Sequence, residues 1–191
     1  MEKFRLSTER RNNLWFGCLL DNQARLVASA FGPVSKNVTQ HLADYSKNKG
    51  GDAVRDENSL THEMIELFEG KKASKPVVYN MEHVSKFQRQ VYDVLGQIPY
   101  GKVTTYGLIS RRLGSAPRAV GRAVASNPWP LFIPCQRVVN FNLTVGNYGI
   151  CGSLGPEGTV TKRSLLQREG VDIIGDRIEQ KSLWDPSRQN L

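Results

Sequence analysis

Cys135 is the residue of this sequence best placed to do chemistry. It follows the apolar run 131–133 and Pro134, and Arg137 lies two positions after it. The thiolate form of cysteine is the nucleophile, and nearby positive charge lowers the pKa of a thiol. The pattern therefore predicts a nucleophile at the end of a buried segment, with Arg137 favouring the thiolate. Most free cysteines are instead small buried apolar side chains, so the surrounding sequence has to decide between these interpretations.

The charge distribution points to a partner. The net charge is +8, from 26 basic and 18 acidic residues. Residues 94–156 contain no Asp or Glu, whereas Arg111, Arg112, Arg118 and Arg122 all lie there. A stretch of one sign is typical of a nucleic-acid-binding face, although a solvated basic surface would have the same composition.

The remaining composition excludes several classes of protein. The three cysteines and three histidines are too scattered for a disulfide framework or a CxxC metal pair. No apolar run is long enough to span a bilayer, and the first residues do not form a signal peptide. We expect an intracellular monomer, nuclear or cytoplasmic, with no metal, no cofactor and no membrane partner.

The elements that must position Cys135 are predicted in two parts. The first part reads as a small α/β unit, with strands at 14–20, 26–31 and 76–79, helices at 34–45 and 59–70, and a polar loop at 47–52. Ser59 is the predicted N-cap of the second helix. The second part begins with an amphipathic helix at 86–96 and ends with another at 161–168, after which a loose tail is expected from about Arg177.

Two short helices precede the cysteine segment. Thr105 can cap the first, which ends at Gly114, and Pro117 suits the first turn of the second. Such a pair predicts a helix-turn-helix. The second helix is rich in Ala, Gly and Val, with Arg118 at its leading end. This composition favours a close approach to the minor groove with base flipping over major-groove reading, although small residues also mark tight packing in a core.

Several spaced motifs then occur in register between Phe87 and Gly170, and through them the sequence resembles the O6-alkylguanine-DNA alkyltransferases (methylated-DNA–protein-cysteine methyltransferases). The first half resembles the variable N-terminal domain of that family in size and strand–helix pattern alone. The motifs are Phe87-Gln88-Arg89-Gln90-Val91, Gly101 to Tyr106, Arg118-Ala119-Val120-Gly121, Asn127-Pro128, Ile133-Pro134-Cys135-Gln136-Arg137-Val138, Val145-Gly146-Asn147-Tyr148 and Leu165-Leu166 with Glu169-Gly170.

The resemblance implies direct reversal of O6-alkylguanine in double-stranded DNA, with O4-alkylthymine as the less favoured substrate. Cys135 would accept the alkyl group irreversibly, in a single turnover. Tyr106 would assist the leaving guanine, Arg118 would replace the extruded nucleotide and Asn127 would brace the active-site turn. The implied catalytic group is Cys135, Tyr106, Gln136, Glu169 and Asn127; the implied DNA contacts are Thr105, Arg118, Ala119, Gly121, Arg122, Ala123 and Arg137; the implied pocket residues are Val124, Pro130, Val138, Val145, Tyr148 and Gly149.

Three positions depart from the family pattern. Gln136 stands where the family usually has His, so a relay from Cys135 to Glu169 that needs a titrating group is broken, although an amide can still orient a water. Gly149 replaces a small hydroxyl residue, and Arg122 replaces a small residue. We therefore expect a slower or pH-shifted transfer.

Two other functions remain open at this stage. A non-enzymatic lesion sensor, resembling the alkyltransferase-like proteins, would bind damaged guanine without accepting the group. A winged-helix regulator would explain the helix pair but not the cysteine motif. The predicted fold is an α/β N-terminal domain (1–79), a linker (80–86), a mainly α, winged-helix-like domain with the helix-turn-helix and the cysteine (87–177), and a tail (178–191).

Overall fold

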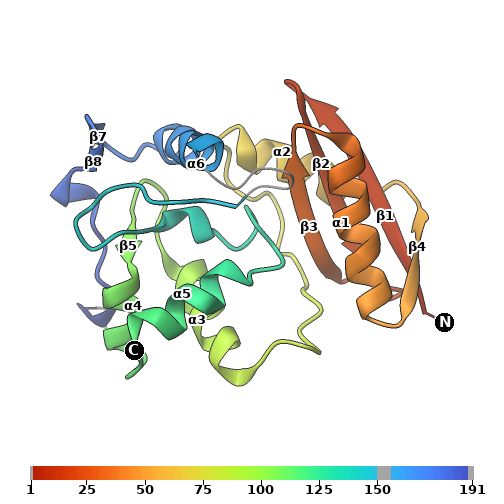
Figure 1. Ribbon diagram of the computed structural model, residues 1–191, viewed down its shortest axis with the longest axis horizontal. Helices are drawn as coiled ribbons and strands as arrows, with labels where there is room; N and C mark the ends of the chain where they lie inside the picture. The colour runs from red at the N-terminus through yellow and green to blue at the C-terminus, as the bar shows by residue number, and fades with distance from the viewer. Residues whose placement is uncertain (1, 150–155, 189–191) are drawn as a thin grey trace. The chain divides into compact units, whose positions relative to one another are not determined.

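The computed structural model describes residues 2–149 and 156–188, which form two compact units (Figure 1). The N-terminal unit contains residues 2–83, 128–132 and 149, and the C-terminal unit contains the rest. The chain therefore leaves the C-terminal unit at residue 128 and returns to it at residue 133, shortly before Cys135. The division predicted from the sequence treats the domains as unbroken stretches and contains no such crossing.

A four-stranded sheet forms the centre of the N-terminal unit, in the order β3-β2-β1-β4. The first three strands are antiparallel neighbours, and the fourth pairs in parallel with the first. Asn12 and Asn13, both with positive φ, make the β1–β2 turn, a conformation that asparagine tolerates. The strands are β1 (Glu2–Arg11), β2 (Leu14–Leu20), β3 (Leu26–Gly32) and β4 (Gly51–Arg55).

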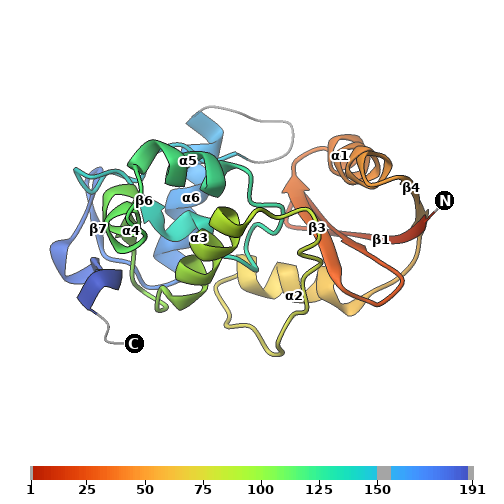
Figure 2. The same ribbon diagram turned by 90° about the horizontal axis from the view of Figure 1, so that it is seen from below.

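Two helices cover the two faces of this sheet (Figure 2). α1 (Ser35–Asn48) packs against Phe4, Leu6 and Leu19. α2 (Ser59–Phe68) brings Phe68 against the stacked rings of Phe16 and Phe31 on the other face. Alternating side chains of a strand point to opposite faces, so each strand supplies both layers of the core.

Several predictions for the N-terminal unit need correction. β1 was not predicted, because its apolar positions are few among charged and hydroxyl residues. The predicted polar loop at 47–52 overlaps the end of α1 and the start of β4. Asn58, rather than Ser59, caps α2, by accepting from the Thr61 backbone N–H. The predicted strand at 76–79 contributes one parallel bridge, between Tyr79 and Leu26.

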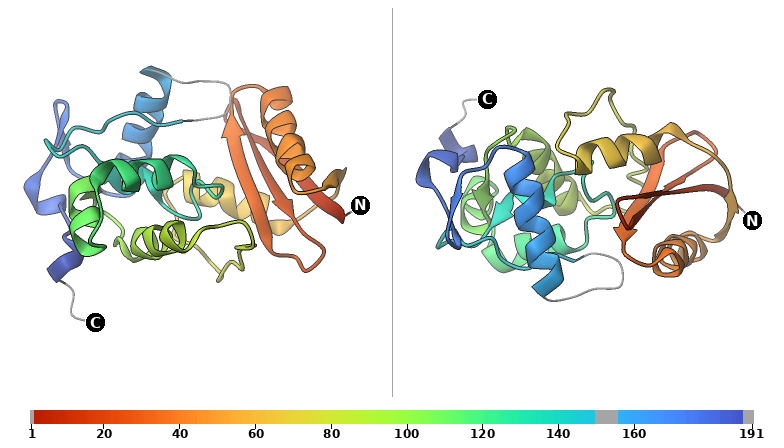
Figure 3. Two further views of the ribbon diagram at one scale, coloured as in Figure 1. Left: turned by 60° about the horizontal axis from the view of Figure 1, so that its bottom comes forward. Right: turned by 90° about the horizontal axis from the view of Figure 1, so that it is seen from above.

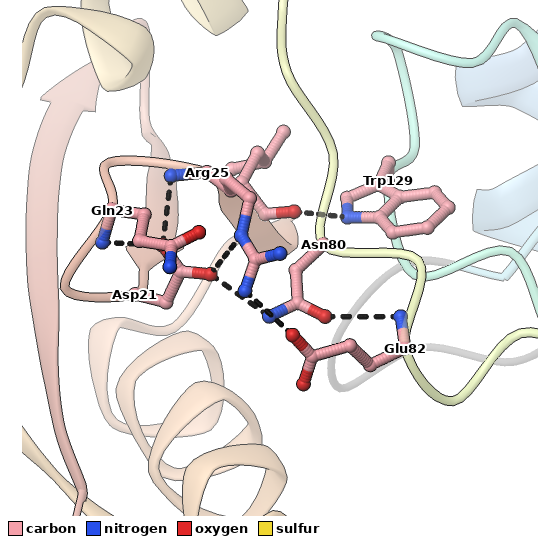
Figure 4. Close-up of polar contacts among 7 residues, drawn as sticks. Asp21, Gln23, Arg25, Asn80, Glu82 and Trp129 are labelled. Carbon is pink, nitrogen blue, oxygen red and sulfur yellow. Dashed lines mark hydrogen bonds and ion pairs between the residues drawn. The ribbon is translucent and has the colours of Figure 1, made fainter.

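Residues 128–132 are attached to the edge of β3. The indole Nε1 of the fully buried Trp129 donates to the backbone oxygen of Leu26 at 2.9 Å (Figure 4). Ser29 donates its backbone N–H to Pro128 and its hydroxyl to the Pro130 carbonyl. Leu131 is buried with φ of 73°, a conformation unusual for a residue with a Cβ. The segment just before the cysteine motif is therefore held by strand β3.

The C-terminal unit is mainly helical (Figure 3), and its described residues also form two pairs of two-residue strands and three short 3-10 turns. Val103, Val139, Val145, Leu166, Val171 and Ile178 pack into one cluster of its core. Its helices are α3 (Lys86–Gln97), α4 (Tyr106–Arg112), α5 (Pro117–Ala125) and α6 (Pro156–Arg168). The strands are β5 (Thr104–Thr105), β6 (Val138–Val139), β7 (Ile173–Ile174) and β8 (Arg177–Ile178); the 3-10 turns are η1 (Cys135–Arg137), η2 (Gln180–Ser182) and η3 (Pro186–Arg188).

Two predictions for the C-terminal unit are also wrong. α6 starts five residues before the predicted position. The expected loose tail is packed as far as residue 188: Ser182 and Trp184 are buried, and their backbone groups exchange hydrogen bonds with Val103. Among the helices of the described residues, none is long and apolar enough to cross a bilayer.

Candidate active site around Cys135

Cys135 begins the short turn η1, directly before the parallel pair of β6 with β5. Pro134 is buried, and the Asn127 amide donates to the Ile133 carbonyl at 2.9 Å, which closes the turn leading to the cysteine. The position predicted for a bracing asparagine therefore contacts this turn. Cys135 itself is 8% exposed, so the residue is almost fully enclosed by the protein.

The sulfur of Cys135 has polar neighbours inside the core. Tyr148 Oη lies 3.9 Å from Sγ, and the Asn127 side chain also hydrogen-bonds the sulfur. Burial raises the pKa of the Cys135 thiol, while the bonds from Asn127 and Tyr148 and the charge of Lys162 oppose that rise. The resting site therefore holds a thiol whose surroundings are prepared for a thiolate.

Gln136, which follows the cysteine, reaches Glu169 directly. Its Nε2 donates to Glu169 Oε1 at 2.8 Å, and both side chains are almost fully buried. The other amide atom, Gln136 Oε1, is buried and has no hydrogen-bond partner among the described residues. An amide neither takes up nor releases a proton near neutral pH, so this contact orients groups but cannot relay protons.

Arg137 does not act as predicted. Its Nε forms a 2.6 Å ion pair with Glu169 Oε2, and its Nη1 donates to the Ile98 carbonyl at 2.8 Å. The guanidinium also lies 5.0 Å from the ring centroid of Tyr100. The Arg137 side chain is 13% exposed, and its Nε and Nη1 are engaged by Glu169 and Ile98. The charge that acts on the thiol comes instead from Lys162.

Lys162 is the residue that sequence reasoning missed. It is 1% exposed, and its Nζ donates to the Val138 carbonyl at 2.7 Å. Burial lowers the pKa of Lys162 to about 8, although the negative charge of Cys135 opposes this. A signal was available, because Lys162 lies three and four positions before Leu165 and Leu166 and so on the apolar side of the helix.

Tyr106 occupies the first position of α4, after the cap that Thr105 provides by accepting from the Leu108 N–H at 3.2 Å. Burial raises the pKa of Tyr106, and the negative charge of Cys135 raises it further. The phenol of Tyr106 is therefore protonated. It lies near enough to Cys135 for the negative charge of a thiolate to act on it. Thr105 is itself buried and serves as this cap, so the structure does not place it on the surface as the predicted DNA contact.

α4 and α5 pack against each other across a four-residue connection (Figure 3). Arg118 and Arg122 are exposed, and Ala119 and Gly121 are half-buried. A Cβ added to Gly121 would meet no atom within 4 Å, so packing inside the protein does not require glycine there. Ala123, by contrast, is buried and its carbonyl accepts from Tyr92, so the predicted DNA contact at Ala123 faces the interior.

The predicted pocket residues fall into two groups. Val124, Val138, Val145 and Tyr148 are buried in the C-terminal unit that holds Cys135. Val138 already accepts from Lys162, and Val145 packs with Val103, Val139 and Leu166. Pro130 and Gly149 belong to the N-terminal unit, so their predicted place beside the cysteine stays a prediction.

One close contact fixes the position of Tyr148. A Cβ added to Gly158 of α6 would lie 1.8 Å from the Tyr148 carbonyl oxygen. Since no side chain fits in that space, glycine allows the helix to press against the backbone that carries Tyr148. Within residues 2–149 and 156–188 no group of three or more His, Cys, Asp or Glu side chains could hold a metal ion.

Comparisons with known proteins agree on one family. Residues 86–171 match the family model described as "6-O-methylguanine DNA methyltransferase, DNA binding domain". A methylated-DNA–protein-cysteine methyltransferase of Archaeoglobus fulgidus is 35% identical over 137 residues, covering 71% of this chain and 87% of that protein. One of Saccharolobus islandicus is 39% identical over 122 residues, covering 62% and 75%. The crystal structure of the O6-methylguanine-DNA methyltransferase of Pyrococcus kodakaraensis is similar with a TM-score of 0.69 and 26% identity, covering 88% and 99%.

Proposed function

Since this chain belongs to the methylated-DNA–protein-cysteine methyltransferase family, we propose that it repairs DNA by moving an alkyl group from O6 of guanine to Sγ of its own Cys135. The observation that carries the proposal is the buried Sγ of Cys135, which Tyr148 and Asn127 contact. The negative charge of Cys135 also acts on the Tyr106 phenol. Hydrogen bonds to the sulfur favour its thiolate form, and the thiolate is the nucleophile.

The reaction is an in-line displacement at a saturated carbon. The thiolate of Cys135 forms an S–C bond, the C–O6 bond breaks, and its electron pair stays on the guanine oxygen. Guanine becomes neutral when it takes up one proton, for which the protonated phenol of Tyr106 is a suitable donor. The product is a thioether that no group of the site can cleave, so each molecule acts once and needs no cofactor.

For DNA binding we propose a helix-turn-helix formed by α4 and α5, with α5 in the minor groove. The open space beside Gly121 supports a close approach of the helix to a ligand rather than to its own core. The exposed Arg118 at the leading end of α5 would fill the gap left by the flipped nucleotide. Binding should depend little on sequence and weaken with salt, because phosphate contacts from Arg118, Arg122 and Arg111 would dominate.

The decisive experiment is the intact mass of the protein after incubation with duplex DNA containing O6-methylguanine, followed by peptide mapping. One added methyl group on Cys135 is expected, with no increase for Cys135→Ala. The map also covers Cys151, which lies outside the described residues. Unmodified wild-type protein that still binds the lesion selectively would contradict the proposal and make the chain a damage sensor.

The sensor alternative is not favoured, because it leaves the polar surroundings of Cys135 without a purpose. A transcription regulator would instead bind one undamaged sequence selectively. A binding measurement on undamaged duplexes of different sequence, alongside a lesion duplex, separates these cases. Arg118→Ala should reduce the rate of alkyl transfer about tenfold, since flipping costs a few kcal/mol, while affinity for undamaged duplex changes less. An unchanged transfer rate would rule out the extrusion role.

A further inference from the structure

Lys162 is a buried cation without an ordinary counter-ion. Its side chain is 1% exposed, and its Nζ donates to the Val138 carbonyl at 2.7 Å. Among residues 2–149 and 156–188, no carboxylate lies within ion-pair distance of it. An ammonium taken out of water without an anion is strongly disfavoured, so this amine either stays neutral or is charged opposite a negative group nearby.

The negative group that acts on the Lys162 amine is the thiolate of Cys135. The interaction is mutual: the charge of Cys135 favours the ammonium of Lys162, and the charge of Lys162 favours the thiolate of Cys135. The Tyr148 ring, which contacts the sulfur through its hydroxyl, also lies 6.0 Å from Lys162 Nζ. Cys135, Tyr148 and Lys162 therefore form one cluster within the C-terminal unit.

The other groups around the sulfur are poor partners for its proton. Asn127 and Gln136 carry amides, which do not titrate. Burial raises the pKa values of Tyr92, Tyr106 and Tyr148, so all three phenols are already protonated. Both carboxylate oxygens of Glu169 are occupied, by Gln136 and by Arg137.

Resting on the proposed alkyl transfer, we propose that Lys162 is the counter-ion of Cys135, so that the two form a thiolate–ammonium pair. Where Lys162 is a neutral amine it also accepts the thiol proton: the S–H bond breaks, an N–H bond forms on Nζ, and the pair as a whole stays neutral. Where Lys162 is already an ammonium, the thiol proton passes to water and the ammonium stabilises the thiolate that remains. Neither route needs a histidine. After transfer the thioether is neutral, and the ammonium has lost its anion and releases the proton to water.

The test is Lys162→Met, which keeps the length and apolar stem of the side chain but removes the charge. Reaction of Cys135 with iodoacetamide, followed across pH by peptide mapping, reports the thiol pKa without DNA. In the variant this profile should move to higher pH, because burial is then less opposed. At neutral pH both iodoacetamide reaction and methyl transfer should fall about tenfold for each unit of pKa increase, and both should recover as the pH is raised.

Two further variants make the result decisive. Lys102→Met is a matched control, since Lys102 Nζ also donates to a backbone carbonyl, that of Lys181 at 2.7 Å, but is not buried. It should leave the iodoacetamide profile unchanged. Lys162→Arg restores a permanent charge and should move the profile back toward that of the wild type.

The outcomes separate this inference from the proposed function. A Lys162→Met profile at the wild-type pH, with reactivity lowered equally at all pH values, would overturn the counter-ion role and leave a structural one. Wild-type protein that takes up no methyl group from DNA would overturn the proposed function, while the iodoacetamide profiles would still decide whether Cys135 and Lys162 are paired.

Discussion

Each of the two units buries a cluster of ionisable groups, but the hydrogen bonds and ion pairs made to these groups are far more complete in one unit than in the other. In the N-terminal unit Asp21 is 1% exposed and accepts four hydrogen bonds, from the backbone of Gln23 and Arg25 and from the side chains of Arg25 and Asn80 (Figure 4). Burial alone would raise the pKa of Asp21, but these bonds lower it below its ordinary value.

The Cys135 cluster of the C-terminal unit is incomplete by comparison. Burial raises the pKa of Cys135, Lys162 relies on one carbonyl, and Gln136 Oε1 has no partner among the described residues. A fully bonded buried charge stabilises a fold, whereas an incompletely bonded one keeps capacity for a ligand or a reaction. The hydrogen bonds of Asp21 therefore stabilise the 21–25 loop of the N-terminal unit. The incomplete bonding around Cys135 leaves the C-terminal unit with a reactive group instead.

Asp21→Ala gives the largest expected effect on stability. Removing the carboxylate leaves the donors of Arg25 and Asn80 without their acceptor, which should lower the free energy of unfolding by about 3 kcal/mol. Chemical denaturation measures the loss, and Asp21→Asn should lose less because it keeps one acceptor oxygen. Reaction of Cys135 with iodoacetamide should be unchanged under conditions where the variant is folded. If Asp21→Ala lost less stability than Asp21→Asn, the hydrogen bonds of Asp21 would not stabilise the N-terminal unit as the comparison requires.

Gly158→Ala tests the reactive cluster through packing. The new Cβ cannot share space with the Tyr148 carbonyl, so helix α6 or Tyr148 has to move. We expect a loss of about 2 kcal/mol in unfolding free energy from this overpacking, together with slower methyl transfer. Gly96→Ala in α3 is the matched control, because its Cβ would meet nothing within 4 Å. Equal stability of the two variants would show that the close contact is not required.

Gln136→His tests the Cys135 cluster by adding a proton acceptor to it. A neutral imidazole between Cys135 and Glu169 can accept a proton, so transfer near neutral pH should rise by about tenfold. The rate is measured in single turnover with O6-methylguanine duplex across pH. In the Lys162→Met background the gain should be larger, since the imidazole would then replace the missing proton acceptor. A slower single variant would mean that the orientation of Glu169 by the amide matters more than proton uptake.

The smallest effect concerns acid. The folded-state pKa of Asp21 lies below its unfolded value, so its stabilising contribution is complete above the unfolded pKa of about 4. It is lost as the pH falls toward the lower folded pKa. Denaturation at a series of acidic pH values should show this decline in the wild type and a shallower one in Asp21→Asn. Identical slopes would mean that Asp21 is not bonded as described.

The sequence predicted most of the elements around Cys135 because their signals are local. Pro117, Thr105 and the apolar stripes mark helix positions directly, and the Cys135 motif stands out by its neighbours. β1 escaped prediction since its strand character depends on pairing with β2 and β4, which no local pattern reports. The part of Lys162 was missed for the same reason, and the charge beside the thiol was assigned to Arg137, which pairs with Glu169. Which cation meets a thiol and which meets a carboxylate is decided by tertiary packing, and in the sequence both were simply charges.

The attachment of residues 128–132 to β3 has a consequence for how the chain can be synthesised and cut. Trp129 and Leu131 complete the N-terminal unit, yet they lie more than forty residues beyond its last continuous residue. During translation Ser29 and the backbone oxygen of Leu26 lack their bonds to residues 128–130 until those residues have left the ribosome. A fragment ending at residue 83 would keep the pairing of Leu26 with residues 78–80 but would expose Ser29, so the first 83 residues are not a transferable module. Shuffling of the two halves between relatives has to exchange residues 128–132 together with β3.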